Sequence, residues 1–162
     1  MNIRKTTLND FEEVSAIYGI ARAYMRSHGN PDQWGDAYPS GEMILEDIQR
    51  GNSYLIEEAG QICGVFVFII GEDPSYRIIQ NGKWNSSVPY GTIHRIASNG
   101  RKHGIAQRCF EYCDQQIDYL RIDTHRDNLT MQAAIKGFGF RECGTIFVSN
   151  GPRLAFDRIR PE

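Results

Sequence analysis

Residues 94–106 read HRIASNGRKHGIA, and the pattern of the chain changes twice within this stretch. The mainly apolar segment up to residue 97 is typical of a β-strand, and Ser98-Asn99-Gly100 is a turn signal. The residues RKHG follow at 101–104, and a helical pattern begins at Ile105. We therefore expect a strand, a short basic loop and a helix that starts next to a glycine.

The start of this helix is suited to binding an anion. A helix N-terminus exposes unpaired backbone N–H groups and carries about half a unit of positive charge. Gly104 has no Cβ atom to keep an anion away from the backbone, and Arg101, Lys102 and His103 add cationic or polar side chains around it. Residues 101–106 thus suit a pyrophosphate. A plain strand-to-helix turn with solvated basic side chains is the alternative that these residues leave open.

Hydrophobic periodicity predicts the other elements of the chain. Apolar residues at three- and four-residue spacing predict helices at 11–25, 40–50, 105–117 and 128–138. Besides a strand at the N-terminus, apolar runs rich in β-branched and aromatic residues predict strands at 53–57, 62–70, 90–97, 120–123, 140–148 and 153–159. Residues 71–89 mix Gly, Pro, Asn and Ser and are expected to form a long excursion.

The order of these elements predicts a mixed sheet. Strands joined by short turns form antiparallel hairpins, whereas the strand–helix–strand unit at residues 90–123 must be parallel. The fold class is α/β (α+β): about six to seven strands form one mixed, mostly antiparallel sheet, and about four helices flank it. We expect residues 1–162 to form a single domain.

The composition is that of a soluble globular protein. Hydrophobic residues make up 41% of the chain and charged residues 23%, and a formal net charge of −2 provides no positive field for nucleic acid. The cysteines form no Cys-x-x-Cys pair, so we expect buried thiols and no metal. No apolar run is long enough for a signal peptide or a membrane span. We expect a cytoplasmic protein with no nucleic-acid or membrane partner; a homodimer is compatible with these residues.

A longer stretch around the basic loop is similar to a known family. Residues 95–110, RIASNGRKHGIAQRCF, resemble the acetyl-CoA-binding segment of the GCN5-related N-acetyltransferase (GNAT) superfamily. In that family a strand is followed by the pattern Arg/Gln-x-x-Gly-x-Gly/Ala and then by a helix. The matching positions in this chain are Arg101, Gly104 and Ala106.

Residues 121–140, RIDTHRDNLTMQAAIKGFGF, are similar to the second motif of the same family. The asparagine and the closing Gly-Phe of that motif fall here at Asn128 and at Gly139-Phe140. Two motifs in the family's order imply a GNAT-like fold, in which the two central parallel strands splay apart. They also imply an N-acetyltransferase that depends on acetyl-CoA.

The resemblance implies how the co-substrate acetyl-CoA lies. Its pantetheine arm is expected between the splayed strands, where it bonds to the backbone of residues 96–98, and its pyrophosphate over residues 101–106. Asn128 is expected near the thioester. The residues that the resemblance assigns to cofactor binding are Ile96, Ala97, Ser98, Arg101, Lys102, His103, Gly104, Ile105, Ala106 and Asn128.

The sequence departs from the family at the positions that usually carry the chemistry. Relatives often have a tyrosine at the position of Ile135, and many have a glutamate early in the strand that here begins Tyr90-Gly91-Thr92. His94 is the candidate catalytic base, because imidazole exchanges protons near neutral pH; a histidine satisfied within the strand is the alternative. Glu72 and Asp73 are rival candidates for the base.

Two further pairs of residues are expected around the site. Arg95 on the central strand and Asp123 on its parallel neighbour are expected to form a structural ion pair, since a buried charge needs compensation; orientation of His94 or His125 is the alternative role. Trp34 and Tyr38 lie between the first two helices, in the loop that walls the acceptor site in GNAT relatives. They are candidates for substrate binding, with core packing as the alternative.

The function predicted from the sequence is direct transfer of an acetyl group from the thioester to an amine of a small-molecule or peptide acceptor. A non-catalytic regulatory module that binds CoA or acyl-CoA is the alternative, because the usual tyrosine and glutamate are missing. No cluster of like charges indicates which amine is the acceptor.

Overall fold

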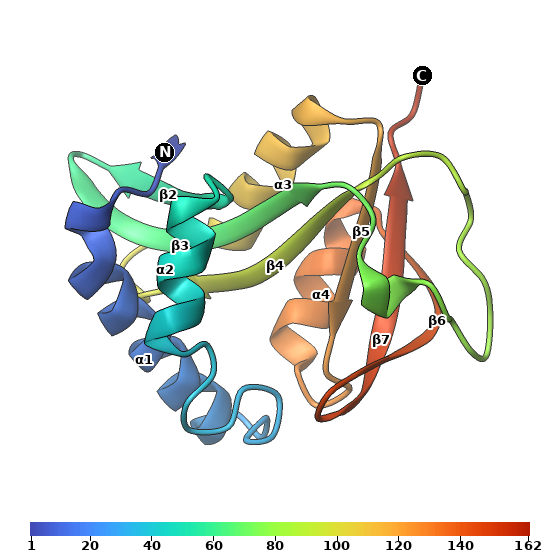
Figure 1. The fold of residues 1–162 in the computed structure, drawn as a ribbon, viewed down its shortest axis with the longest axis horizontal. Helices are drawn as coiled ribbons and strands as arrows, with labels where there is room; N and C mark the ends of the chain where they lie inside the picture. Colours follow the sequence, from blue (N-terminus) through green and yellow to red (C-terminus); the bar gives the residue numbers. More distant parts are fainter.

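Seven strands form one open, mixed sheet with helices on both faces in the computed structural model, which describes residues 1–162 (Figure 1). The strands are β1 (Asn2–Lys5), β2 (Ser53–Glu58), β3 (Gln61–Ile70), β4 (Gly91–Ser98), β5 (Tyr119–Thr124), β6 (Arg141–Val148) and β7 (Gly151–Ile159). The α-helices are α1 (Phe11–Ser27), α2 (Gly41–Gln49), α3 (Ile105–Gln116) and α4 (Leu129–Phe138). The strand order is β1-β2-β3-β4-β5-β7-β6, with β4–β5 as the parallel pair. This arrangement confirms the expected fold class.

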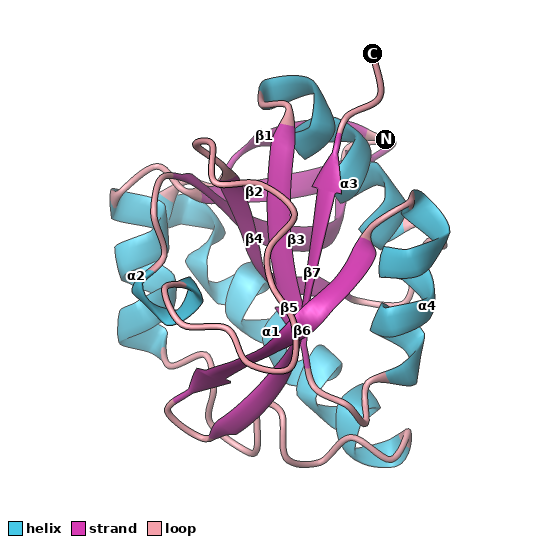
Figure 2. Ribbon diagram, turned by 90° about the vertical axis from the view of Figure 1, so that its right-hand side faces the viewer, coloured by secondary structure: helices cyan, strands magenta, loops and turns pink.

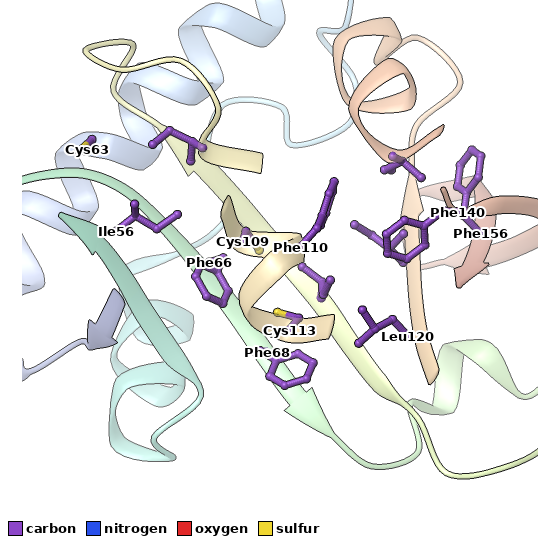
Figure 3. Packing of buried hydrophobic residues seen from close by; sticks show 14 residues of the cluster. Ile56, Cys63, Phe66, Phe68, Cys109, Phe110, Cys113, Leu120, Phe140 and Phe156 are labelled. Carbon is purple, nitrogen blue, oxygen red and sulfur yellow. The ribbon is translucent and has the colours of Figure 1, made fainter. Parts of the chain in front are cut away.

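Helices α1 and α2 lie on one side of the sheet, and α3 and α4 lie on the other (Figure 2). The largest core cluster packs between the sheet and α3 and α4, where Phe66, Phe110, Leu120 and Phe156 are fully buried (Figure 3). A second cluster contains Val14 of α1 and fills the space beneath α1 and α2. All four cysteines are free and buried, as expected. None of the helices combines the length and the apolar composition needed to cross a membrane.

The helix starts follow local signals in the sequence. Ser40 Oγ accepts a hydrogen bond from Met43 N at 3.2 Å, and this cap begins α2 at the expected residue. Before α1, the backbone N–H of Thr7 donates to the Asp10 carboxylate at 2.7 Å, and a single 3-10 turn leads into the helix. Strand β7 begins at Gly151, two residues earlier than expected, because the turn from β6 needs only Ser149 and Asn150.

The parallel pair of strands separates soon after it forms. Strands β4 and β5 pair only at Gly91–Leu120 and Thr92–Arg121, although both strands continue beyond these residues. Figure 1 shows β4 turning away from β5. Arg95 has a φ of 50°, and the register between β3 and β4 shifts at this point, so β4 contains a bulge. The splay expected from the resemblance is therefore present.

The excursion between β3 and β4 is tied to the sheet by polar and aromatic contacts. The backbone N–H and the side-chain amide of Asn85 both donate to the buried Asp157 carboxylate at 2.8 Å. The Arg121 guanidinium lies 4.1 Å and 4.0 Å from the ring centroids of Trp84 and Tyr90, where cation–π attraction compensates its burial. These contacts fix the segment that carries Asp73 into the site.

Candidate active site

Two cavities adjoin at the place where β4 separates from β5. The larger has a volume of about 750 Å³ and the smaller about 490 Å³. Met25 of α1, Ile96 of β4, and Asn128 and Met131 at the start of α4 line both cavities. A ligand that extends from one cavity can thus meet a ligand in the other between the splayed strands.

The smaller cavity lies beside the start of α3. Every residue that the resemblance assigns to the cofactor lines this cavity except Arg101, which is exposed and whose guanidinium contacts Gln61 Oε1 at 3.3 Å. Gly104 has a left-handed backbone with φ 82°, and no side chain caps α3. The N–H groups of the first turn therefore have no side-chain partner, which leaves them available to an anion.

An amide cluster lies at the junction of the two cavities. The side-chain amide groups of Asn30 and Asn128 each donate to Gln33 Oε1 at 2.9 Å, and Asn128 Oδ1 accepts from Met131 N at 3.0 Å. The Asn128 side chain thus caps α4 and holds the loop after α1. Asn30 lines the smaller cavity, and its buried Oδ1 atom has no hydrogen-bond partner. The sequence analysis missed Asn30, because its Asn-Pro context indicated only the end of a helix.

His94 and Asp73 form a hydrogen-bonded pair in the wall of the larger cavity. Their Nε2 and Oδ2 atoms lie 2.9 Å apart, and both side chains are half-buried. Asp73 is oriented by Ser75 N, which donates to its carboxylate at 2.8 Å, and by its own N–H, which donates to the Tyr90 hydroxyl at 2.8 Å. Burial alone would raise the pKa of Asp73, but the hydrogen bonds from His94 and Ser75 outweigh it and lower that pKa.

The two carboxylates considered as rival bases occupy different surroundings. Asp73 contacts His94, so it is placed to orient the imidazole and not to compete with it. Glu72 is exposed and pairs with Arg77 at 2.6 Å, and it does not line the larger cavity. Of the two, the structure brings only Asp73 into the site.

The expected ion pair between Arg95 and Asp123 is wrong. Arg95 instead makes a bidentate contact with Asp47 of α2, with N–O distances of 2.7 Å and 2.9 Å, and donates to the Tyr38 hydroxyl at 3.0 Å. Asp123 accepts a hydrogen bond from the Tyr76 hydroxyl at 2.7 Å. The reason is the backbone: the bulge at Arg95 and the separation of the two strands place these residues apart.

Asp123 makes the stability of the protein depend on pH. Its desolvated position in the cavity wall raises the pKa of its carboxyl above the ordinary value, which applies in the unfolded chain. The free energy of unfolding therefore falls as the pH rises from the pKa of Asp123 in the unfolded chain to its higher pKa in the folded protein. It stays lower at all higher pH values. We expect Asp123→Asn to raise the melting temperature at about pH 7.5 and much less at about pH 4. Thermal unfolding at both pH values measures this, and an equal shift at both would contradict it.

The predicted substrate residues also line the larger cavity. Trp34 is buried and packs edge-on against Tyr18, with 5.7 Å between ring centroids, so it serves the core as well as the cavity wall. Tyr38 is more exposed, and its hydroxyl accepts the hydrogen bond from Arg95. Polar residues that were not singled out from the sequence also line this cavity, among them Thr124 at the end of β5 and Arg153 on β7.

The chain resembles solved structures of acetyltransferases. No model of a known protein family matches the sequence, and no curated protein matches it. Among solved structures, an acetyltransferase of the GNAT family from Streptococcus agalactiae is 30% identical, with a TM-score of 0.91 over 99% of this chain and 96% of that chain.

Two more distant structures share the fold alone. They are a ribosomal-protein-alanine N-acetyltransferase from Brucella melitensis (20% identity, 98% and 99% coverage, TM-score 0.62) and AAC(6')-Ib (16% identity, 98% and 93% coverage, TM-score 0.65). The identity to the Streptococcus agalactiae protein extends over nearly the whole of both chains, and on this ground the present chain belongs to the GNAT family of acetyltransferases.

Proposed function

We propose that this protein transfers the acetyl group of acetyl-CoA to the amino group of a small-molecule acceptor. The observation that carries the proposal is the meeting of two cavities between β4 and β5. One cavity ends on the uncapped start of α3, and the other contains the His94–Asp73 pair. The same fold in AAC(6')-Ib was solved in complex with ribostamycin and coenzyme A, so it can hold a small acceptor and the cofactor together.

The smaller cavity fits the chemistry of CoA. A diphosphate would bind the backbone N–H groups of the first turn of α3, with Lys102 and His103 beside it. Beyond the last paired residues of β4 and β5, the backbone at Ile96–Ser98 no longer bonds to β5, so an amide-containing arm can replace the missing strand. The unpartnered Asn30 Oδ1 is a further acceptor for an N–H group of that arm.

The larger cavity supports proton removal from the acceptor. An ammonium group must lose a proton before its nitrogen can attack the thioester carbon, and His94 is positioned by Asp73 to accept it. In the transfer the C–N bond forms, the C–S bond breaks, and the nitrogen loses its second proton to the departing thiolate or to solvent. Ile135, at the position where relatives often place a tyrosine, is fully buried and offers no proton to sulfur. A thiolate is a tolerable leaving group near neutral pH, because an unperturbed thiol has a pKa of about 8.5.

Substitution of Gly104 tests the proposed acetyl-CoA site, with Gly60 as a matched control. Gly104→Ala and Gly60→Ala each place a Cβ on a left-handed residue, at φ 82° and 77°, without a close contact. Each should cost about 1–2 kcal/mol of stability. Only Gly104→Ala should weaken acetyl-CoA binding, by about 10- to 100-fold, because Gly104 lines the smaller cavity at the start of α3 and Gly60 does not.

Isothermal titration with acetyl-CoA measures both variants against the wild-type protein. Equal affinity of the two variants would contradict the assigned cofactor site, and no binding to the wild-type protein would contradict the proposed function. CoA release with a panel of amines then tests transfer itself. Binding without release on any amine would instead support the regulatory module considered from the sequence.

A further inference from the structure

Arg153 is a buried cation in the wall of the larger cavity that lacks a carboxylate partner. Its residue exposure is 5%, yet it takes part in no ion pair. Its guanidinium donates only to neutral oxygens: Pro152 O at 2.9 Å, Gln33 O at 3.2 Å and Asn150 Oδ1 at 2.8 Å. All three contacts use its Nη atoms, so its Nε–H remains without a partner in the protein.

The other arginines of the sheet that are buried or partly buried have their charge compensated. Arg95 binds Asp47, and Arg158 binds Asp114 at 3.0 Å. Arg121 has no carboxylate either, but it lies over the faces of aromatic rings. Arg153 has neither kind of compensation, and an isolated buried charge is costly. Burial lowers the pKa of Arg153, and the largest opposing influence is the charge of Asp123, which lies beyond ion-pair distance.

Asp123 and Arg153 project from the same face of the sheet. Asp123 is paired in register with Ala155 of β7, and Arg153 lies two residues before Ala155, so its side chain points to the same side. The His94–Asp73 pair lines the same cavity from β4 and the excursion. The cavity thus has a wall with two carboxylates beside the candidate base, and an unpaired guanidinium further along β7.

We propose that Arg153 binds a carboxylate of the acceptor, which is therefore an amine that also carries a carboxylate, such as an amino acid. This inference rests on the proposed function and names its substrate class. A guanidinium presents parallel N–H donors that match a carboxylate, and the contacts to Gln33 and Asn150 hold this fork in place. The ammonium end of the same molecule would lie towards Asp73 and Asp123. A doubly charged phosphate fits less well, since both carboxylates would repel it.

Matched pairs of acceptors test the inference. Glycine, alanine, β-alanine and phenylalanine would each be compared with the corresponding primary amide, by following CoA thiol release. The wild-type protein should favour the acid over its amide by at least about tenfold in kcat/KM. At a given pH a larger fraction of each amide has an unprotonated, reactive amine. This difference alone would favour the amides, which is the opposite of the expected preference.

Variants at Arg153 assign the preference to this residue. Arg153→Gln should lower kcat/KM for acids by about 30-fold or more and change that for amides by less than about threefold. Arg153→Lys, which keeps the charge without the fork, should lie between. Arg141→Gln, at an exposed arginine of β6 without an ion pair, should leave the preference unchanged. The acid-to-amide ratio is taken within each variant, so a loss of folded protein does not affect it.

Two results would overturn the inference. One is a wild-type preference for amides or for simple diamines. The other is an equal loss of kcat/KM for acids and amides in Arg153→Gln. That result would mean that Arg153 only connects the loops that it contacts. If the protein does not bind acetyl-CoA, the proposed function fails, and the carboxylate site is then judged by binding alone. The acids, but not the amides, should raise the melting temperature of the wild-type protein and not that of Arg153→Gln; no difference between acids and amides would overturn it.

Discussion

The Asp47→Ala variant is expected to be about 3 kcal/mol less stable than the wild-type protein, because it leaves the Arg95 guanidinium buried without its carboxylate. The side chains of Arg95 and Asp47 are 13% and 11% exposed, and their contact is bidentate. Tyr18 also donates its hydroxyl to the Arg95 carbonyl oxygen at 3.0 Å, so α1 and α2 hold the bulge of β4 together. Denaturant unfolding measures the loss of free energy.

Glu46→Ala is the matched control for this variant. Glu46 precedes Asp47 on the same helix and pairs with Arg50 at 2.7 Å, but both side chains are more than half exposed. Its loss should cost less than about 0.5 kcal/mol. The double variant Arg95→Met and Asp47→Leu should recover part of the stability. A cost for Asp47→Ala no larger than that for Glu46→Ala would show that the pair does not hold the bulge.

Substitution of His94 by glutamine is expected to lower kcat by about 10²- to 10⁴-fold, the usual range for removal of a general base. Glutamine keeps a polar side chain beside Asp73 but cannot accept the proton of the acceptor amine. The affinity for acetyl-CoA should change little, because His94 lines the larger cavity and not the smaller one. Steady-state CoA release and titration with acetyl-CoA measure the two quantities on the same preparation.

Substitutions of Asp73 and Glu72 distinguish the orientation of His94 from general effects on the segment between β3 and β4. Asp73→Asn should lower kcat by about tenfold or more, because the hydrogen bond that orients His94 is weakened. Glu72→Gln, which changes only an exposed pair with Arg77, should leave kcat near the wild-type value. A His94→Gln variant that retains half of the wild-type kcat would remove His94 from the mechanism.

The divergence of β4 from β5 connects these effects. A continuous parallel sheet would pair every backbone group of both strands and leave no space between them. Here pairing stops after Thr92, and the left-handed residue Arg95 turns β4 aside. The ion pair to Asp47 stabilises this bulge, and the space that it opens connects the two cavities. The stability expected to depend on Asp47 and the catalytic role proposed for His94 therefore involve the same stretch of β4.

Local patterns in the sequence were sufficient to predict the elements and their order. Periodicity, the serine cap of α2 and the glycine-containing turn before α3 depend on residues that are close along the chain, so spacing alone reveals them. For the same reason, the pattern of residues 94–106 was enough to predict a strand, a basic loop and the start of α3. Trp34 and Tyr38, which the sequence offered as candidates for substrate binding, line the larger cavity, and their contact with an acceptor stays a prediction.

The pairing of charges was decided by the tertiary structure. His94 meets Asp73 across a long excursion, Arg95 meets Asp47 and not Asp123, and Arg153 is left without a carboxylate. These partners are far apart in sequence, and their contacts depend on one left-handed backbone residue and on where two strands stop pairing. A charged side chain can reach several partners from its place in the chain, and only the packed backbone selects one of them.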